Sequence, residues 1–297
     1  AYMARYHKLL KVNEYDVVWV EKEIFPWFPA WLELLALHAS TRLIVDYDDA
    51  WFHRYDAHRS IFVRLGLGSK IDAVMRRAKL VTVGNEYLAT RARDARTRHI
   101  EWFPTVIDLE RYPSPECKQP SDEVVVGWIG SPATAKNLEL VAPILADLSK
   151  KHRMRCIAIG AREDQVANTP FHAVPWSEKS ELADLCSFDI GIMPLADDLW
   201  ERGKCGYKLI QYMACGLPVV ASSVGVNSTI VDVGENGFLA SSLSEWAEAL
   251  ERLIGDASLR REFGAAGRKK VEAAYSLQAQ APRLIGFFTD LVSKVTI

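Results

Sequence analysis

Long apolar runs are missing from this sequence, and so is an excess of charge or of cysteine. No uninterrupted apolar run among the 297 residues reaches the roughly 18–20 that a membrane-spanning helix needs, and no signal peptide opens the chain. Lys and Arg total 36 against 38 Asp and Glu, a net charge of -2, which argues against nucleic acid as a partner. The cysteines are odd in number and form no CxxC pair, which favours a reduced, cytoplasmic protein over a disulfide framework or zinc site: Cys117, Cys156, Cys186, Cys205 and Cys215.

The common nucleotide fingerprints and internal repeats are also missing. No G-x-G-x-x-G follows a strand-like run, and no G-x-x-x-x-G-K-[ST] occurs, which argues against the usual dinucleotide oxidoreductases and P-loop NTPases. No period of 20–50 residues recurs, so a solenoid is excluded. The hydrophobic fraction of 49% and charged fraction of 25% are those of a globular protein, and the length suits two domains of roughly 100–200 residues.

Short apolar runs rich in Val and Ile alternate with helical patterns along the whole chain. Such runs predict strands buried on both faces of a parallel sheet, so the fold class is α/β and doubly wound. The expected strands are 17–20, 43–46, 80–83, 99–102, 124–129, 156–159, 189–193, 218–221 and 237–240, and the expected helices include 135–151, 178–187, 207–215 and 244–254.

A proline-rich stretch at 111–122, RYPSPECKQPSD, predicts a linker between two domains. The first domain is then 1–111 and the second 122–277, followed by an apolar helical tail at 278–297. The chain enters a helical pattern directly at Ala1, whereas an α/β domain usually begins with a buried strand. We therefore expect the first domain to lack an N-terminal piece.

The second domain opens with VVVGWIGSPATAKNLE, a buried strand followed by a small-residue turn and a helix start. Backbone N–H groups in such a turn bind anions, because unpaired donors and the helix dipole both favour negative charge. Gly130 and Ser131 form the turn, with Thr134 and Lys136 adding a hydroxyl and a positive charge. The alternative is an ordinary βα turn with a solvated lysine.

Residues 190–240 contain a second group of polar side chains at the end of a buried strand. A loop through Glu201 and Gly203 leads to a helix on which Lys208 and Gln211 share one face. Ligands of doubly wound folds bind at the carboxyl end of the parallel sheet, so this loop and helix are candidates for a binding site. The alternative is an amphipathic helix with Lys208 in solvent.

This stretch resembles the donor-binding block of the family 4 (group 1) glycosyltransferases. The family carries K-L-x-E-[YA]-M-A, x-G-x-P-V-V-A and G-x-x-G-x-L, and this chain reads KLIQYMA at 208–214, CGLPVVA at 215–221 and GENGFL at 234–239. The resemblance extends from about residue 81 to the C-terminus. It implies the GT-B fold, two Rossmann-like domains with parallel sheets facing across a cleft, with the final helix crossing back to the first domain.

The resemblance also implies an activity: transfer of a hexosyl unit from a UDP- or GDP-sugar to an acceptor hydroxyl. It implies retention at the anomeric carbon and no divalent metal or other cofactor. The acceptor would be a glycan or a lipid-linked sugar, in the synthesis of cell-surface polysaccharide or glycolipid. Two alternatives stay open, a nucleotide-sugar 2-epimerase of the same fold and a non-catalytic nucleotide-sugar-binding module.

The functional residues of the family transfer only in part. In its E-x7-E motif the second Glu holds the ribose, where this chain has Gln211, and the first falls on Gly203, leaving Glu201 as the nearest carboxylate for the sugar. The phosphate-binding Arg and Lys fall on Trp128 and Lys136, so only the lysine is kept. From the residues and the resemblance together we expect donor binding at Gly130, Ser131, Thr134, Lys136, Gly203, Lys204, Gly206, Tyr207 and Gln211, and catalysis at Asp48, Asp49, Lys208 and Glu201.

The first domain contains VDYDDAWFHRYD after a buried strand. Its D-x-D could hold Mg²⁺ or Mn²⁺ through hard carboxylate oxygens, as in GT-A glycosyltransferases, or cap the next helix. In the GT-B resemblance Asp48 and Asp49 fall on a His-Asp pair that meets the sugar, where they would steer the acceptor or stabilise an oxocarbenium-like centre.

Aromatic and basic residues suggest a peripheral contact with the inner face of a membrane. Residues 25–34 crowd four aromatic side chains, and 70–98 hold eight basic against three acidic residues. Aromatic and basic surfaces suit lipid headgroups. The simpler interpretation is a packed core stripe and a solvated helix face.

Overall fold

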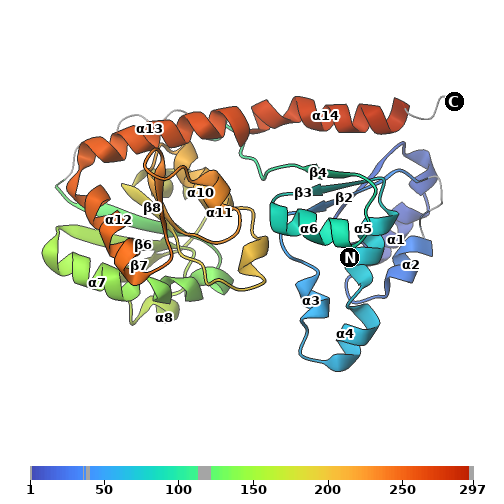
Figure 1. The fold of residues 1–297 in the computed structure, drawn as a ribbon, viewed down its shortest axis with the longest axis horizontal. Coiled ribbons are helices and arrows are strands. Elements are labelled where there is room, and N and C mark those ends of the chain that lie inside the picture. Colours follow the sequence, from blue (N-terminus) through green and yellow to red (C-terminus); the bar gives the residue numbers. More distant parts are fainter. Residues whose placement is uncertain (1, 36, 38–40, 113–121, 294–297) are drawn as a thin grey trace. The chain divides into compact units, whose positions relative to one another are not determined.

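The computed structural model describes residues 2–35, 37, 41–112 and 122–293, which form two compact α/β units (Figure 1). Unit 1 consists of the described residues up to 105, with 198–205 and 281–293. Unit 2 consists of the described residues of 106–197 and 206–280. Each unit has a parallel sheet and a hydrophobic core of its own.

Unit 1 is built on a four-stranded parallel sheet in the order β1-β2-β3-β4. β2 and β3 are almost entirely buried, as their continuous apolar sequences require, whereas β1 alternates between half-buried and exposed side chains. The elements of unit 1 in chain order are α1 (Tyr2–Leu9), η1 (Val12–Glu14), β1 (Val18–Glu21), α2 (Ala30–Leu35), β2 (Leu43–Tyr47), α3 (His53–Asp56), α4 (Ile61–Leu67), α5 (Lys70–Arg77), β3 (Leu80–Val83), α6 (Glu86–Asp94), β4 (Ile100–Trp102) and η3 (Glu201–Gly203).

Unit 2 contains a six-stranded parallel sheet in the order β10-β9-β8-β5-β6-β7. Its faces are covered by two separate apolar clusters, one centred on α10 and the other on α7 and α12. The elements are β5 (Val124–Ile129), η2 (Pro132–Leu140), α7 (Ala142–Lys151), β6 (Met154–Ile159), α8 (Glu163–Val166), β7 (Phe171–Val174), α9 (Glu181–Cys186), β8 (Ile190–Met193), α10 (Tyr207–Ala214), β9 (Val219–Ser222), α11 (Asn227–Ile230), β10 (Gly237–Ala240), α12 (Leu243–Gly255) and α13 (Ala257–Ala274). The last helix, α14 (Leu277–Ser293), begins in unit 2 and ends in unit 1.

The boundary between the units differs from the sequence-based prediction at two places. Residues 106–112 belong to unit 2 and not to the first domain, because Ile107 exchanges backbone hydrogen bonds with Tyr275 and Leu277 (3.0 and 2.9 Å). Residues 198–205 belong to unit 1, although they lie within the sequence of the second domain. The predicted linker at 111–122 falls mostly on 113–121, outside the described residues.

Candidate functional site

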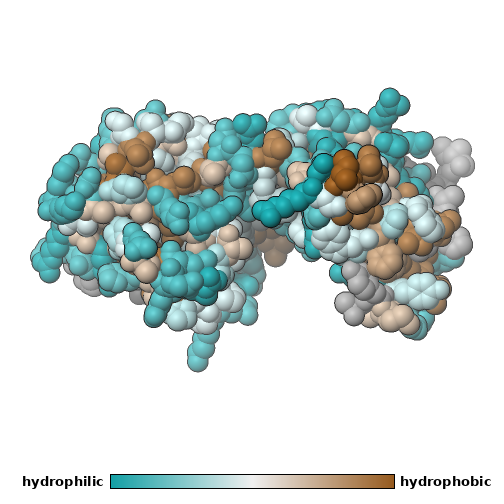
Figure 2. Space-filling model, turned by 90° about the horizontal axis from the view of Figure 1, so that it is seen from below, coloured by the Kyte–Doolittle hydropathy of each residue, from teal (hydrophilic) through white to brown (hydrophobic). Residues whose placement is uncertain are grey.

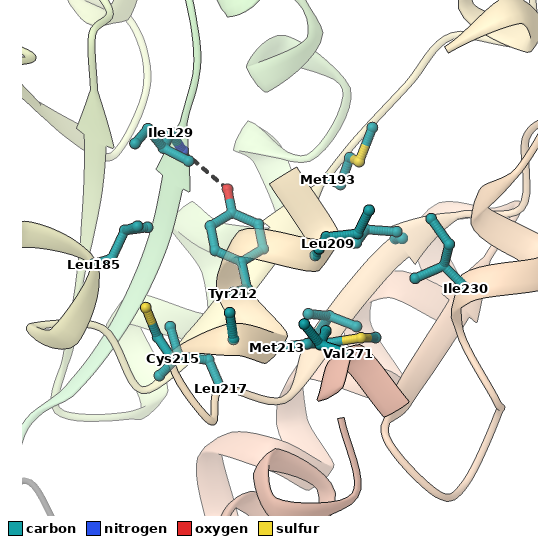
Figure 3. Close-up of a cluster of buried hydrophobic side chains, with 14 of the residues drawn as sticks. Ile129, Leu185, Met193, Leu209, Tyr212, Met213, Cys215, Leu217, Ile230 and Val271 are labelled. Atoms are coloured by element: carbon teal, nitrogen blue, oxygen red, sulfur yellow. Dashed lines mark hydrogen bonds between the residues drawn. The ribbon is translucent and has the colours of Figure 1, made fainter. Parts of the chain in front are cut away.

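Tyr212 fixes the helix that carries Lys208 and Gln211 against the sheet of unit 2 (Figure 3). Its hydroxyl accepts a hydrogen bond from the Ile129 N–H (2.9 Å) and donates to the Ile192 carbonyl (3.2 Å), so it links α10 to β5 and β8. Burial raises the pKa of the Tyr212 phenol, which keeps it neutral and able to make both bonds. The start of α10 is thereby held at the carboxyl ends of these strands.

Lys208, in the first turn of α10, lies directly beside Gly130 at the end of β5. A Cβ added at Gly130 would lie 2.8 Å from Lys208 Cε and 2.5 Å from Trp128 Cζ2, so only glycine allows this approach. Lys208 Nζ also lies 5.5 Å from the centre of the buried Trp128 ring, close enough for a cation–π interaction. The predicted turn and the predicted lysine therefore lie at one edge of the sheet.

The N-terminus of α10 adds backbone donors at the same edge. The helix begins after Gly206, whose φ of 72° is in the left-handed region that glycine adopts without strain. The first N–H groups of a helix have no acceptor within it, and their dipoles favour an anion. Turn, lysine and helix terminus together form an arrangement suited to phosphate oxygens.

The residues after Gly130 form a 3₁₀-helix, η2, rather than the α-helix expected from the sequence. Ser131 and Lys136 are exposed, whereas the Thr134 hydroxyl donates a hydrogen bond to the Ser131 carbonyl (3.0 Å). Of the three predicted polar side chains, Ser131 and Lys136 are thus displayed to solvent, and Thr134 stabilises the turn itself.

Gln211 is buried within a hydrogen-bonded chain of side chains. Its amide donates to the Tyr112 hydroxyl (3.1 Å), which donates to Glu181 Oε1 (2.7 Å), and Trp176 donates to Glu181 Oε2 (2.7 Å). Burial raises the pKa of Tyr112, and also that of the half-exposed Tyr207 at the start of α10. The sequence analysis missed Glu181, because nothing in its surroundings in the sequence connects it to a residue thirty positions away.

Unit 1 holds a second charged group, made of the predicted acidic residues and two lysines. Asp48 pairs with Lys22 (3.0 Å), while Lys204 Nζ lies 3.8 Å from both Asp49 Oδ1 and Glu201 Oε2. Burial raises the pKa of Asp49, and Lys204 opposes that shift. Burial lowers the pKa of Lys22, but hydrogen bonds to Asp48 and Glu21 outweigh it and bring the pKa to about 12.

Gly203 and its neighbours are anchored to the body of unit 1 by close packing. A Cβ at Gly203 would lie 2.3 Å from the Ala50 Cβ, so this position has no room for a side chain. The Asn85 amide donates to the carbonyls of Gly203 and Lys204 (both 2.9 Å). This packing explains why a catalytic carboxylate cannot stand at 203.

The D-x-D carboxylates do not come together around a common point. Asp46 accepts a hydrogen bond from Thr82 (2.5 Å), and burial raises its pKa, whereas Asp48 faces Lys22. Among the residues that the structure describes, no group of three or more His, Cys, Asp or Glu side chains could hold a metal ion.

The comparison with known protein families connects this geometry to a class of enzyme. Residues 123–256, which include β5, Gly130, Lys208 and Gln211, match the model of the family Glycosyl transferases group 1. This part of the chain is therefore similar to the group 1 glycosyl transferases, as the sequence resemblance indicated.

Curated relatives of the chain are also named as glycosyltransferases. The D-inositol 3-phosphate glycosyltransferase of Stackebrandtia nassauensis is 25% identical over 198 residues, covering 59% of this chain and 43% of that protein. The capsular polysaccharide biosynthesis glycosyltransferase CapM of Staphylococcus aureus is 27% identical over 172 residues, covering 53% of this chain and 44% of that protein. The matched regions thus span less than half of the length of these relatives.

Solved structures show the same fold over nearly the whole chain. Sucrose-phosphate synthase from Thermosynechococcus elongatus superposes with a TM-score of 0.76 at 18% identity, covering 97% of this chain and 77% of that one. Anabaena Alr3699/HepE in complex with UDP-glucose superposes with a TM-score of 0.73 at 15% identity, covering 96% and 82%. The fold is GT-B, as the sequence resemblance implied.

Two positions of the glycosyl transferase motif take on other roles in this chain. Trp128 stands where the family carries a phosphate-binding Arg, and its buried ring instead supports Lys208. Gln211 stands where the family carries the ribose-binding Glu, and it donates to Tyr112. The binding and catalytic roles that the sequence analysis assigned to individual residues stay predictions.

Proposed function

We propose that this protein transfers a hexosyl unit from a nucleoside diphosphate sugar to an acceptor hydroxyl. The observation that carries the proposal is the meeting of Lys208, the Gly130 turn and the N-terminus of α10 at one edge of the sheet of unit 2. A cation and the positive end of the helix dipole there would neutralise the leaving diphosphate, stabilising charge that develops in the transition state. Exposed Lys136 is a second cation for the same group.

The nature of the donor is supported by what related proteins bind. Alr3699/HepE has been crystallised with UDP and with UDP-glucose. We therefore propose a UDP-sugar as the first donor to test, with a GDP-sugar as the second. In this proposal Gln211 and Tyr207 face the nucleoside, and the acceptor is a glycan or lipid-linked sugar.

Retention and independence of a divalent metal are part of the proposal. Retention rests on the family resemblance, and proton NMR of the first-formed product distinguishes it from inversion. Metal independence is supported by the lysine partners of Asp48 and Asp49, which already supply positive charge to these carboxylates. Activity that survives EDTA is the expected result, and its loss would revive the D-x-D as a metal site.

Calorimetric titration with UDP and GDP tests the donor site directly. Lys208→Ala should weaken binding of the preferred nucleotide about tenfold to a hundredfold, because a hydrogen bond to a charged group contributes about 1.5–3 kcal/mol. Lys150→Ala is the matched control, since Lys150 is exposed near the end of α7 and pairs with Asp147. Unchanged affinity in Lys208→Ala, or no binding of either nucleotide to the wild type, would contradict the proposed function.

A further inference from the structure

Unit 1 exposes an unusual amount of apolar side chain on two neighbouring segments. On α4, Phe62 and Leu65 are 83% and 79% exposed, and Ile61 is also exposed. On the segment before and within α2, the exposed side chains are Trp27, Phe28 and Trp31. We call these six residues the apolar surface of unit 1.

The two segments are joined through the loop that precedes α4. The Trp27 ring centre lies 5.7 Å from that of His58 and 5.4 Å from that of Tyr55, and the backbone N–H of Trp27 donates to the Tyr55 hydroxyl (3.0 Å). In Figure 1, α3 and α4 project from the sheet of unit 1, and Figure 2 shows apolar side chains gathered on the face seen from that side.

Helix α4 has apolar residues on both of its faces. Val63 and Leu67 pack on the core of unit 1, which accounts for one face. Phe62 and Leu65 point away from that core and stay exposed. Exposed apolar side chains that gather in one place commonly mark an interaction site, so the outer face of α4 calls for a partner.

The two segments that carry the apolar surface have exposed basic residues and no exposed acidic ones. Residues 57–69 contain no Asp or Glu, and Arg59 and Arg64 are exposed there. Within 24–35 the one acidic residue is Glu33, which is buried and paired with Lys70 (2.7 Å). Arg54 lies over the Trp27 ring, with its Cζ 4.7 Å from the ring centre.

Three of the eight basic residues in the stretch that the sequence analysis singled out are engaged within unit 1. At 70–98, Lys70 is buried, Arg91 pairs with Asp56 and Asp72, and Arg93 pairs with Glu86. The aromatic stretch is only in part the packed core stripe of the simpler interpretation, because Phe25 and Leu34 pack on the core whereas Trp31 is 59% exposed.

We propose that the apolar surface of unit 1 docks on an anionic lipid bilayer. Trp and Phe rings enter the boundary between headgroups and acyl chains, and Arg59 and Arg64 face the negative headgroups. A protein partner would need acidic groups placed opposite these arginines. An anionic bilayer has negative headgroups and an apolar interior everywhere along its surface, so it can contact the arginines and the apolar side chains together. Among the described helices none is long and apolar enough to span a membrane, so the contact is peripheral.

Flotation with vesicles of phosphatidylcholine alone, and of phosphatidylcholine with phosphatidylglycerol, tests this proposal on the full chain. Wild-type protein should float with the anionic vesicles, less so at high salt, and weakly with the neutral ones. Arg59→Gln with Arg64→Gln should reduce binding to anionic vesicles roughly thirtyfold, since each basic residue contributes about 1 kcal/mol there. Phe62→Ser with Leu65→Ser should reduce binding to both kinds of vesicle at least about tenfold.

The control is a double variant of two exposed apolar residues on unit 2, Leu140→Ser with Val233→Ser; the two side chains are 43% and 60% exposed in the wild type.

Every variant should keep the circular dichroism spectrum and the nucleotide affinity of the wild type. A failure of the membrane proposal is therefore distinguishable from a failure of the proposed function. Equal flotation of all variants, or none by the wild type, would overturn the proposal. So would a wild-type dimer in sedimentation that Phe62→Ser with Leu65→Ser dissolves, because the surface would then be an interface between copies.

Discussion

Gln211 illustrates how one side chain is determined by its hydrogen-bond partners. The Tyr112 hydroxyl has a single proton, which it donates to Glu181, so it can only accept from a second partner. An amide supplies that donor, and the Gln211 amide lies 3.1 Å away. A carboxylate at 211 would place two acceptors around one proton in a buried site. The departure from the family motif is therefore matched by the presence of Glu181.

Gln211→Glu should destabilise unit 2 by about 1–3 kcal/mol at neutral pH. The Tyr112 hydroxyl oxygen would lose the amide that donates to it, and a charged carboxylate would be buried in place of the amide. Burial and the Glu181 charge favour the protonated form of the new carboxyl in the folded state, so its pKa is raised there. The loss is full above that folded pKa and shrinks as the pH falls toward about 4, the usual value for Glu. Urea unfolding between pH 4 and 8 measures it.

Exchanging the two groups provides the control. In the double variant Gln211→Glu with Glu181→Gln, Tyr112 again has one carboxylate and one amide as partners, and most of the stability should return. A single variant as stable as the wild type at pH 8 would show that Gln211 is not held by Tyr112.

Trp128 and Gly130 together determine where the Lys208 side chain lies. The indole ring gives Lys208 a face to lie on, and the missing Cβ of Gly130 gives it room to approach. Both features restrict the lysine to one region of the sheet edge. A flexible cation held in place loses less side-chain entropy on binding a phosphate, which compensates in part for the Arg that this chain lacks.

At the scale of elements, a buried ion group joins three parts of unit 1. Lys70, at the start of α5, pairs with Glu23 (2.5 Å) after β1 and with Glu33 (2.7 Å) on α2. Tyr55 also donates to Glu23 (2.8 Å), and the Glu33 carboxylate accepts from the Ile24 N–H (3.2 Å). These bonds hold the segment that leads to Trp27 in position.

Lys70→Met should cost about 3–5 kcal/mol of folding free energy, because it leaves two buried carboxylates without their common counter-ion. Urea denaturation followed by tryptophan fluorescence measures the loss. Lys150→Met, at a position 74% exposed, is the control and should stay within about 0.5 kcal/mol of the wild type. A loss below about 1 kcal/mol for Lys70→Met would mean that Glu23 and Glu33 are satisfied without the lysine.

The strands were predictable from sequence because burial on both faces demands continuous apolar runs. Each predicted strand is present, and β2, β5 and β10 match closely. β7 was missed, since FHAV is a short edge strand with the exposed His172 in it. Residues 135–140 of the predicted helix at 135–151 form 3₁₀-helix, and the spacing of apolar residues does not distinguish the two kinds of helix.

The candidate site was predictable only where a local pattern marks it. The Gly130 turn and the α10 face follow a buried strand or carry a motif, and the structure brings Gly130 and Lys208 together. The partners Tyr112, Glu181 and Trp128 act through contacts between distant segments, for which no local pattern exists. The same holds for the contact between Gly203 and Ala50.

At the scale of the whole molecule, the chain passes between the two units four times, at 105/106, 197/198, 205/206 and 280/281. Neither unit is therefore one continuous stretch of sequence. The eight residues 198–205 are enclosed by unit 2 in the sequence but pack on Ala50 and Asn85 of unit 1.

A fragment of residues 106–280 should consequently be cut by trypsin after Lys204, whereas the full chain resists at this bond. In the full chain the Lys204 side chain is only 17% exposed and its carbonyl accepts from Asn85, so the bond is protected. Mass spectrometry of the early products measures the difference. Cleavage after the exposed Lys179 should be similar in both chains, and equal resistance at Lys204 would contradict the expectation.

The interleaved course of the chain has a consequence for engineering and for descent. Replacing the sequence 106–280 with the corresponding part of a protein of the same fold would bring in eight residues that fit the first unit of that other protein. A working hybrid needs the recipient's own 198–205, or Ala50 and Asn85 transplanted with it. Recombination between such genes should therefore favour breakpoints that keep these distant pieces of one lineage together.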